Sequence, residues 1–232
     1  LVDYDDVLNK QREIIYKRRR RILEASKGEV SKEGKVSPIR QAQGRNVSKG
    51  ELKSDVLEKI QNTISTLVTI NSTEELDGGE STSQKIVSEF CTIIPFDENS
   101  QKQLAQQIES LSTNEEKIDL LSKIATDVYE KREGHMGKDL MRQIERFVML
   151  SVVDNLWMDH LDAIENLRGG IGLRGYGQRD PLVEYKNEAF KMFEQLINGI
   201  DDEIVHRIYK IQVQQAPPSV ATHRHIVAQP AG

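Results

Sequence analysis

The chain has 232 residues, of which 37% are apolar and 5% aromatic, and its formal net charge is −5. Lys, Glu, Gln, Ile and Leu are plentiful and stretches of alternating β-branched residues are nearly absent, so we predict an all-α fold of elongated helices. The lone cysteine, Cys91, excludes an intrachain disulfide and a cysteine-based zinc site, and no apolar run approaches the ~18 residues of a membrane-spanning helix.

The N-terminal part is basic, because residues 1–53 hold 14 Lys and Arg against 8 Asp and Glu. Residues 4–24 predict a first helix that opens on Asp5 and Asp6 and carries a run of cations, Lys17 to Arg21, towards its end. This run suits a solvated helix end, and binding to nucleic acid or anionic lipid is the other interpretation. Since the chain begins with Leu1 rather than Met, we expect it to be part of a longer protein.

Residues 27–50 are rich in Gly, Ser, Lys and Gln, and we expect a flexible insertion there, within a first region that spans residues 1–69. Helical periodicity resumes near Ser54. Residues 70–133 predict a small helical module, with capping boxes at Ser100 with Gln103 and at Thr113 with Glu116. Cys91 falls on an apolar face of this module, which favours a buried thiol.

Residues 134–215 predict two long helices, at about 139–167 and 180–211, after a bend near Gly134 and Gly137. The first has two apolar stripes, so we expect it to pack against both the return helix and the first helix of the chain. The return helix has a clear start, with Asp180 as the N-cap and Pro181 at the first helical position. Residues 216–232 have little to bury and are expected to be a disordered tail. The residues expected to pack within this scaffold are Phe147, Leu150, Trp157 and Ile164.

The connection between the two long helices, residues 169–179, predicts a loop with apolar groups at a polar tip. It holds five glycines, which permit backbone conformations closed to other residues, and this combination suits gripping a ligand without sequence readout. Residues 170–175 also match the G-x-G-x-x-G pattern, but a helix precedes them where a dinucleotide site needs a strand. The glycines are Gly169, Gly170, Gly172, Gly175 and Gly177, and the apolar residues are Ile171, Leu173 and Tyr176.

No catalytic site emerges from the sequence. Asp159, His160 and Asp162 crowd one helix without a paired nucleophile, so His160 is expected on a polar face, and Asp201 with Asp202 is expected to be solvated. His135 lacks a second ligand at metal spacing, and no metal site is predicted. A P-loop is also missing, so this chain is expected to bind no cofactor.

Two stretches carry a resemblance to a known family. YDDVLNKQREIIYKRR, residues 4–19, and LWMDHLDAIENLRGGIGLRGYGQRDPLVEYKNEAFKMF, residues 156–193, resemble the C-terminal third of SecA, the bacterial preprotein translocase motor. The resemblance implies a helical scaffold, a helical wing at about residues 70–130 and a two-helix finger. In this family the fingertip approaches the translocating polypeptide at the mouth of the SecY channel, which implies contacts by Leu173, Arg174 and above all Tyr176.

The same resemblance implies partners and a location. The partners are unfolded preprotein, the SecY channel and upstream motor domains that would bind ATP and Mg and hydrolyse the ATP. The location is the inner face of the plasma membrane. The exposed apolar stripes also favour a homodimer, and an anionic membrane surface is a further partner to consider. The alternatives are an independent helical module that binds nucleic acid or anionic lipid through its basic helix end, and an enzyme that uses the glycine loop.

Overall fold

The computed structural model describes residues 2–25, 49–73, 81–174 and 180–211. The regular elements of these residues are helices, which confirms the predicted all-α fold. The expected insertion at 27–50 and the expected tail at 216–232 lie almost entirely outside the described residues. The helices are α1 (Val2–Glu24), α2 (Lys49–Thr73), α3 (Thr82–Ile93), α4 (Glu98–Ser110), α5 (Asn114–Met136), α6 (Lys138–Arg174) and α7 (Pro181–Ile208).

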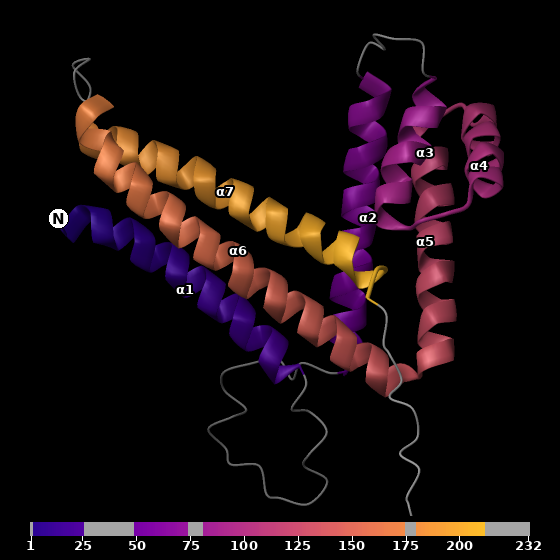
Figure 1. The fold of residues 1–232 in the computed structure, drawn as a ribbon, viewed down its shortest axis with the longest axis horizontal. Helices are drawn as coiled ribbons and strands as arrows, with labels where there is room; N and C mark the ends of the chain where they lie inside the picture. Colours follow the sequence, from indigo (N-terminus) through magenta and orange to yellow (C-terminus); the bar gives the residue numbers. More distant parts are fainter. Residues whose placement is uncertain (1, 26–48, 74–80, 175–179, 212–232) are drawn as a thin grey trace, which may run out of the picture.

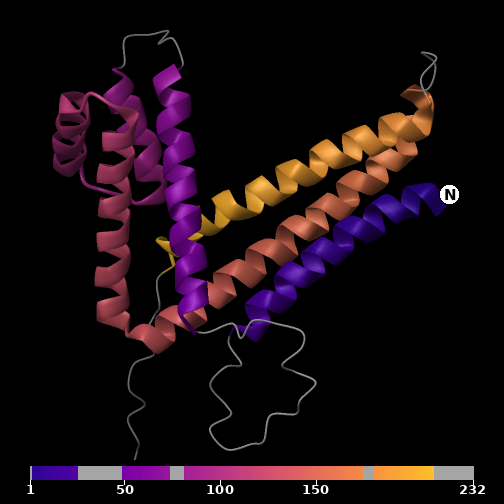
Figure 2. The same cartoon turned by 180° about the vertical axis from the view of Figure 1, so that it is seen from behind.

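The helices form two groups that diverge from a common corner (Figure 1). Helices α1, α6 and α7 lie side by side as a long arm, and the view from behind shows the same arrangement (Figure 2). Helices α2, α3, α4 and α5 form the second group, in which α2 packs on α3 and α5. Because α2 also contacts α6 and α7, it joins the two groups.

Helix α2 supplies a continuous apolar stripe to the core. Its buried residues Val56, Ile60, Ile64 and Val68 recur every fourth position, so one helix face is apolar along its length. The helix begins at Lys49, five residues before the predicted start near Ser54. Periodicity alone missed this first turn, although Leu52 is buried at the next position of the same stripe.

Side-chain caps define the helices of the second group. The predicted capping box of Thr113 and Glu116 is confirmed at the start of α5, whereas the one predicted at Ser100 is wrong. Asp97 caps α4 instead, because its carboxylate accepts hydrogen bonds from the backbone amides of Asn99 and Ser100 at 3.1 Å. A further capping box, Ser81 with Gln84, opens α3 and was not predicted. Cys91 of α3 is half-buried against the core, and burial raises the pKa of its thiol.

The long helices of the arm pack as their two apolar stripes predict, since α6 contacts both α7 and α1. Trp157 and Ile164 are buried and Leu150 is partly buried, as expected. Phe147 is 65% exposed, so its predicted burial is wrong. Sequence periodicity places Phe147 on an apolar stripe, but it cannot say how far a partner helix covers each residue of that stripe.

Candidate functional site: the tip of the α6–α7 hairpin

The loop between α6 and α7 is shorter than the predicted residues 169–179, because α6 continues to Arg174. Gly169, Gly170 and Gly172 are therefore helical, and their assignment to the loop is wrong. Leu173 and Arg174 are the last two residues of α6, while Gly175, Tyr176 and Gly177 lie outside the described residues. Because residues 170–174 are helical, they do not form the turn that a dinucleotide fingerprint needs.

The return helix begins as predicted. The Asp180 carboxylate accepts a hydrogen bond from the backbone amide of Leu182 at 2.8 Å, and Pro181 occupies the first helical position. Glu184 adds a negative charge in the first turn, where the helix dipole favours it. The far end of α7 is at Ile208 rather than at the predicted Ile211, and a turn follows.

A small apolar cluster holds the outer end of the arm together. Ile164 and Ile171 of α6 pack with Tyr185 and Ala189 of α7, and each of the four is at most 4% exposed. Tyr4 of α1 closes the cluster, with its ring centre 4.6 Å from that of Tyr185. The prediction that Ile171 keeps an apolar group exposed at the tip is therefore wrong, and its burial explains how α6 remains helical through a glycine-rich stretch.

One buried polar side chain, Gln11, connects all three helices of the arm in its interior. Gln11 of α1 donates from Nε2 to the Ala189 carbonyl of α7 at 3.0 Å, and its Oε1 lies 2.9 Å from Nε2 of His160 on α6. The His160 ring stacks on Trp157 and meets Phe193 at a tilt, and burial lowers its pKa. His160 is only 6% exposed, so its predicted place on a polar face is wrong.

The basic run at the end of α1 is largely engaged within the chain. Arg18 pairs with Asp201 of α7, and Nε of Arg19 lies 2.9 Å from Oδ1 of Asp154 on α6. Lys59 of α2 adds a contact of 3.1 Å to Asp201, so Asp201 is part-exposed but held by two cations, while Asp202 is exposed as expected. These pairs join α1 to its neighbours, and they occupy two of the cations on which binding to nucleic acid or anionic lipid would depend.

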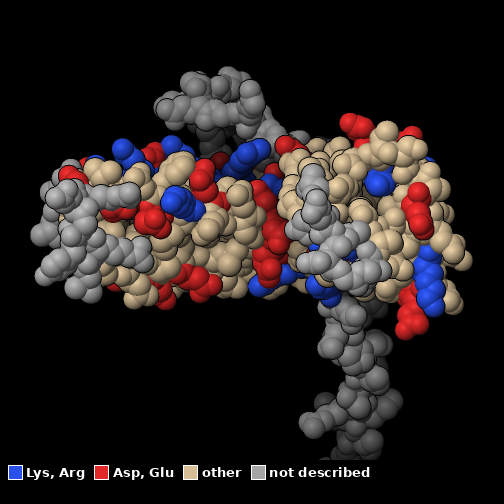
Figure 3. Space-filling model, turned by 90° about the horizontal axis from the view of Figure 1, so that it is seen from above, with Lys and Arg blue, Asp and Glu red and all other residues tan. Residues whose placement is uncertain are grey.

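Charges of both signs are interspersed on the face of the arm seen from above, and acidic side chains form a band between the arm and the second group (Figure 3). This face does not present the uniform basic surface typical of nucleic-acid binding. Among the described residues, no group of three or more His, Cys, Asp or Glu is placed to hold a metal ion. None of the helices in this part of the chain is long and apolar enough to cross a membrane.

Comparison with known proteins decides the family. The model of the SecA wing and scaffold domain matches residues 1–212. The chain belongs to the SecA family. The resemblance carried by residues 4–19 and 156–193 is thus confirmed, and the match extends over α1 to α7 rather than over those two stretches alone.

Similar proteins that carry the SecA name cover nearly the whole chain. It is 36% identical over 216 residues to the protein translocase subunit SecA of Dehalococcoides mccartyi strain 195, a match of 92% of this chain and 19% of the relative. The SecA subunit of Symbiobacterium thermophilum is 36% identical over 94% of the chain and 22% of its own length. That of Pelotomaculum thermopropionicum is 35% identical over 98% and 22%. The chain thus spans about a fifth of the SecA relatives it matches.

Proposed function

We propose that the chain supplies the wing, the scaffold and the two-helix finger of a protein translocase of the SecA type. The observation that carries this proposal is the α6–α7 hairpin, which extends away from the second helix group with α1 along its side (Figure 2). At 1.5 Å per residue, the 37 residues of α6 reach about 55 Å. In this proposal α6 and α7 form the finger, α1 and α2 belong to the scaffold, and α3 to α5 form the core of the wing.

The finger would act by contact and positioning at its tip. The cluster of Ile164, Ile171, Tyr185 and Ala189 packs the outer ends of α6 and α7 together, so a force at the tip would pass into the arm rather than bend one helix. Leu173, Arg174 and Tyr176 would then meet unfolded preprotein at the mouth of the SecY channel. A tyrosine ring suits a partner of changing sequence, because it has a large apolar face and a polar hydroxyl.

Other regions of a SecA-length protein would bind ATP and Mg and would work at the inner face of the plasma membrane. Large apolar side chains along the arm suit contact with such regions or with a second copy, since they are more than half exposed in this chain. They are Tyr16, Phe147, Met158 and Phe190.

The test is a chimaera in which this chain replaces the matching fifth of the Symbiobacterium thermophilum relative. Tyr176→Ala in that chimaera should reduce the translocation of a model preprotein into SecY-containing vesicles at least several-fold, while ATP hydrolysis changes less. The matched control is Ile14→Ala, which removes an exposed apolar side chain from the side of the arm rather than from its tip.

Photo-crosslinking supplies a second readout that does not depend on turnover. A benzoylphenylalanine at position 176 should form adducts with a stalled preprotein, and the same group at the exposed position Phe190 of α7 should form few. Unchanged translocation by Tyr176→Ala, together with equal adducts at both positions, would overturn the proposed role of the tip.

A further inference from the structure

The α5–α6 corner, where the chain passes from the second helix group to the arm, has a connection of one residue. Helix α5 ends at Met136 and α6 begins at Lys138, with Gly137 between them at a φ of 86°. The Gly137 amide donates to the Glu133 carbonyl at 2.8 Å, and its carbonyl accepts from the Met141 amide at 3.1 Å. A backbone connection this short leaves the angle between α5 and α6 to be set by the side chains packed around it.

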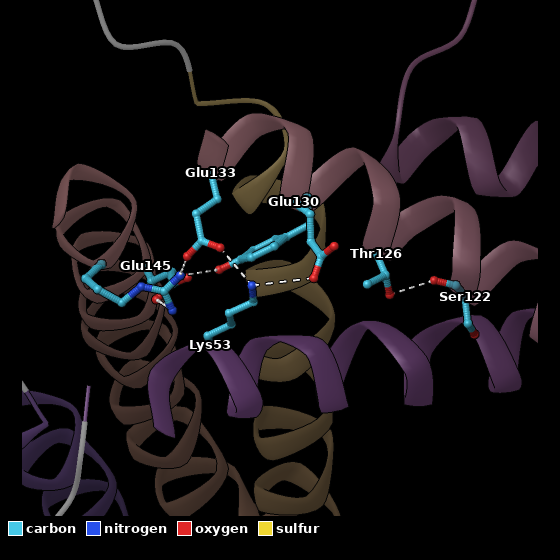
Figure 4. A network of polar contacts seen from close by, with 8 residues as sticks. Lys53, Ser122, Thr126, Glu130, Glu133 and Glu145 are labelled. Carbon is cyan, nitrogen blue, oxygen red and sulfur yellow. Dashed lines mark hydrogen bonds and ion pairs between the residues drawn. The ribbon is translucent and has the colours of Figure 1, made fainter. Parts of the chain in front are cut away.

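A network of charged side chains crosses this corner (Figure 4). Glu133, in the last turn of α5, accepts hydrogen bonds from Arg142 of α6 and, at 2.7 Å, from Lys53 of α2. The Lys53 ammonium is also 3.7 Å from Glu130 and lies over the ring of Tyr129, 5.6 Å from its centre. The carboxylate of Glu133 therefore connects three helices, two of one group and one of the other.

Glu145, three residues after Arg142 on α6, differs from the other members of this network because its carboxyl group has no hydrogen-bond partner among the described residues. Its side chain is fully buried, and Nη1 of Arg142 lies 2.9 Å from its Oε2. That contact lacks hydrogen-bond geometry, and among the described residues neither oxygen of Glu145 has a hydrogen-bond partner. Arg142 therefore stands between two buried carboxyl groups, Glu133 across the corner and Glu145 on its own helix.

The surroundings of Glu145 favour its neutral form. Burial raises the pKa of Glu145 to about 8, and the Lys53 ammonium opposes part of this rise. Arg132 of α5 is directed elsewhere, since its guanidinium donates to the carbonyls of Tyr209 and Ile211. Besides Glu145, the titratable and charged groups of this network are Lys53 on α2, Tyr129, Glu130 and Glu133 on α5, and Arg142 on α6.

We propose that the α5–α6 corner is a protonation-controlled hinge. While Glu145 is neutral, Arg142 is held by Glu133, and the angle between α5 and α6 is fixed. Once Glu145 loses its proton, a buried anion appears beside Arg142. The guanidinium must compensate this charge, because no described residue donates a hydrogen bond to either oxygen of Glu145. Arg142 then divides its contacts between two carboxylates, so its hold on Glu133 weakens and α5 gains freedom relative to α6 about Gly137.

A distance measurement across the corner tests this hinge. In a Cys91→Ser background, spin labels are placed at two exposed positions, Glu115 at the start of α5 and Glu165 on α6, and the distance between them is measured at pH 6.5 and pH 9.5. The distribution should be narrow at pH 6.5 and broader or displaced at pH 9.5. In Glu145→Gln, which is neutral at every pH and has nearly the same shape, it should stay as at pH 6.5.

A control substitution and a direct titration complete the test of the hinge. Asp162→Asn removes an exposed carboxylate of the same helix and should respond to pH as the unsubstituted chain does. In the unsubstituted chain, carbon NMR of the glutamate carboxyl groups should show one that titrates near pH 8. An equal response to pH in Glu145→Gln, a distance that does not change with pH, or the lack of a carboxyl group titrating between pH 6.5 and 9.5 would each overturn the hinge.

Discussion

The side-chain amide of Gln11 and the imidazole of His160 are in direct contact, with Gln11 Oε1 2.9 Å from His160 Nε2. Because the Gln11 Nε2 group donates to the Ala189 carbonyl at 3.0 Å, the amide presents its oxygen to the ring. His160 must therefore donate from Nε2, which fixes its neutral tautomer. One buried amide thus selects the ring nitrogen of His160 that carries the proton, and it fastens α1 to both helices of the hairpin.

Replacing Gln11 by Ala should destabilise the arm. The change removes two hydrogen bonds. It leaves the His160 donor buried without a partner, at a cost of about 1–3 kcal/mol, whereas the Ala189 carbonyl lies within α7 and is also an acceptor of the helix. Urea denaturation followed by circular dichroism measures the loss. The control is Gln61→Ala, which alters an exposed glutamine of α2. Equal stabilities of the two variants would contradict this role for Gln11.

Stability should depend on pH through His160. Burial lowers the pKa of His160 in the folded protein, while in the unfolded chain it is about 6.5. The unfolded state therefore takes up the proton first, so the contribution of this site is complete above pH 6.5 and is lost as the pH falls through 6.5 towards the folded pKa. We expect the free energy of unfolding between pH 8 and 5 to fall less steeply in His160→Gln. His135→Gln, at an exposed site, should behave as the unsubstituted chain does.

Arg132→Met should loosen the end of α7. The guanidinium of Arg132 donates to the carbonyls of Tyr209 and Ile211, which follow the last residue of that helix, and methionine keeps much of the apolar length without the donors. Hydrogen exchange of the last turn of α7 should accelerate, and stability should fall by about 1–3 kcal/mol. Lys131→Met, at the exposed neighbouring position, serves as the control and should leave both quantities unchanged.

Alanine at Gly169 or Gly170 should stabilise the chain. Both residues are helical, and a Cβ at either position meets no atom within 4 Å, so each change should contribute about 0.5–1 kcal/mol through helix propensity. Gly137→Ala should have the opposite effect, because its φ of +86° is unfavourable for any residue with a Cβ. Thermal unfolding distinguishes these cases. A loss of stability in Gly169→Ala would contradict the continuation of α6 through this stretch.

Two helix starts encoded within a few residues were predicted from the sequence, although the equally local capping box of Ser81 and Gln84 was missed. The start of α7 follows from Asp180 and Pro181, and that of α5 from Thr113 and Glu116, because a cap needs only its own side chain and the adjacent backbone amides. The error at Ser100 has the same local origin, since Asp97 offers a competing cap three residues earlier. The length of α6 was underestimated because glycine has a low helix propensity. The burial of Ile171, which stabilises the last turns of α6, depends on α7 and α1 and is not visible in the local sequence.

The sequence alone determined the family, the helical fold and the order of the long helices, because apolar periodicity and capping are local properties and the two matching stretches are long. Only the tertiary structure decided which polar side chains are buried. His160, Gln11 and Glu145 lie on helices with ordinary polar residues around them, and each is buried by a helix distant in the sequence. The same holds for the tip, where the packing of α1, α6 and α7 outweighs the glycines of residues 169–174.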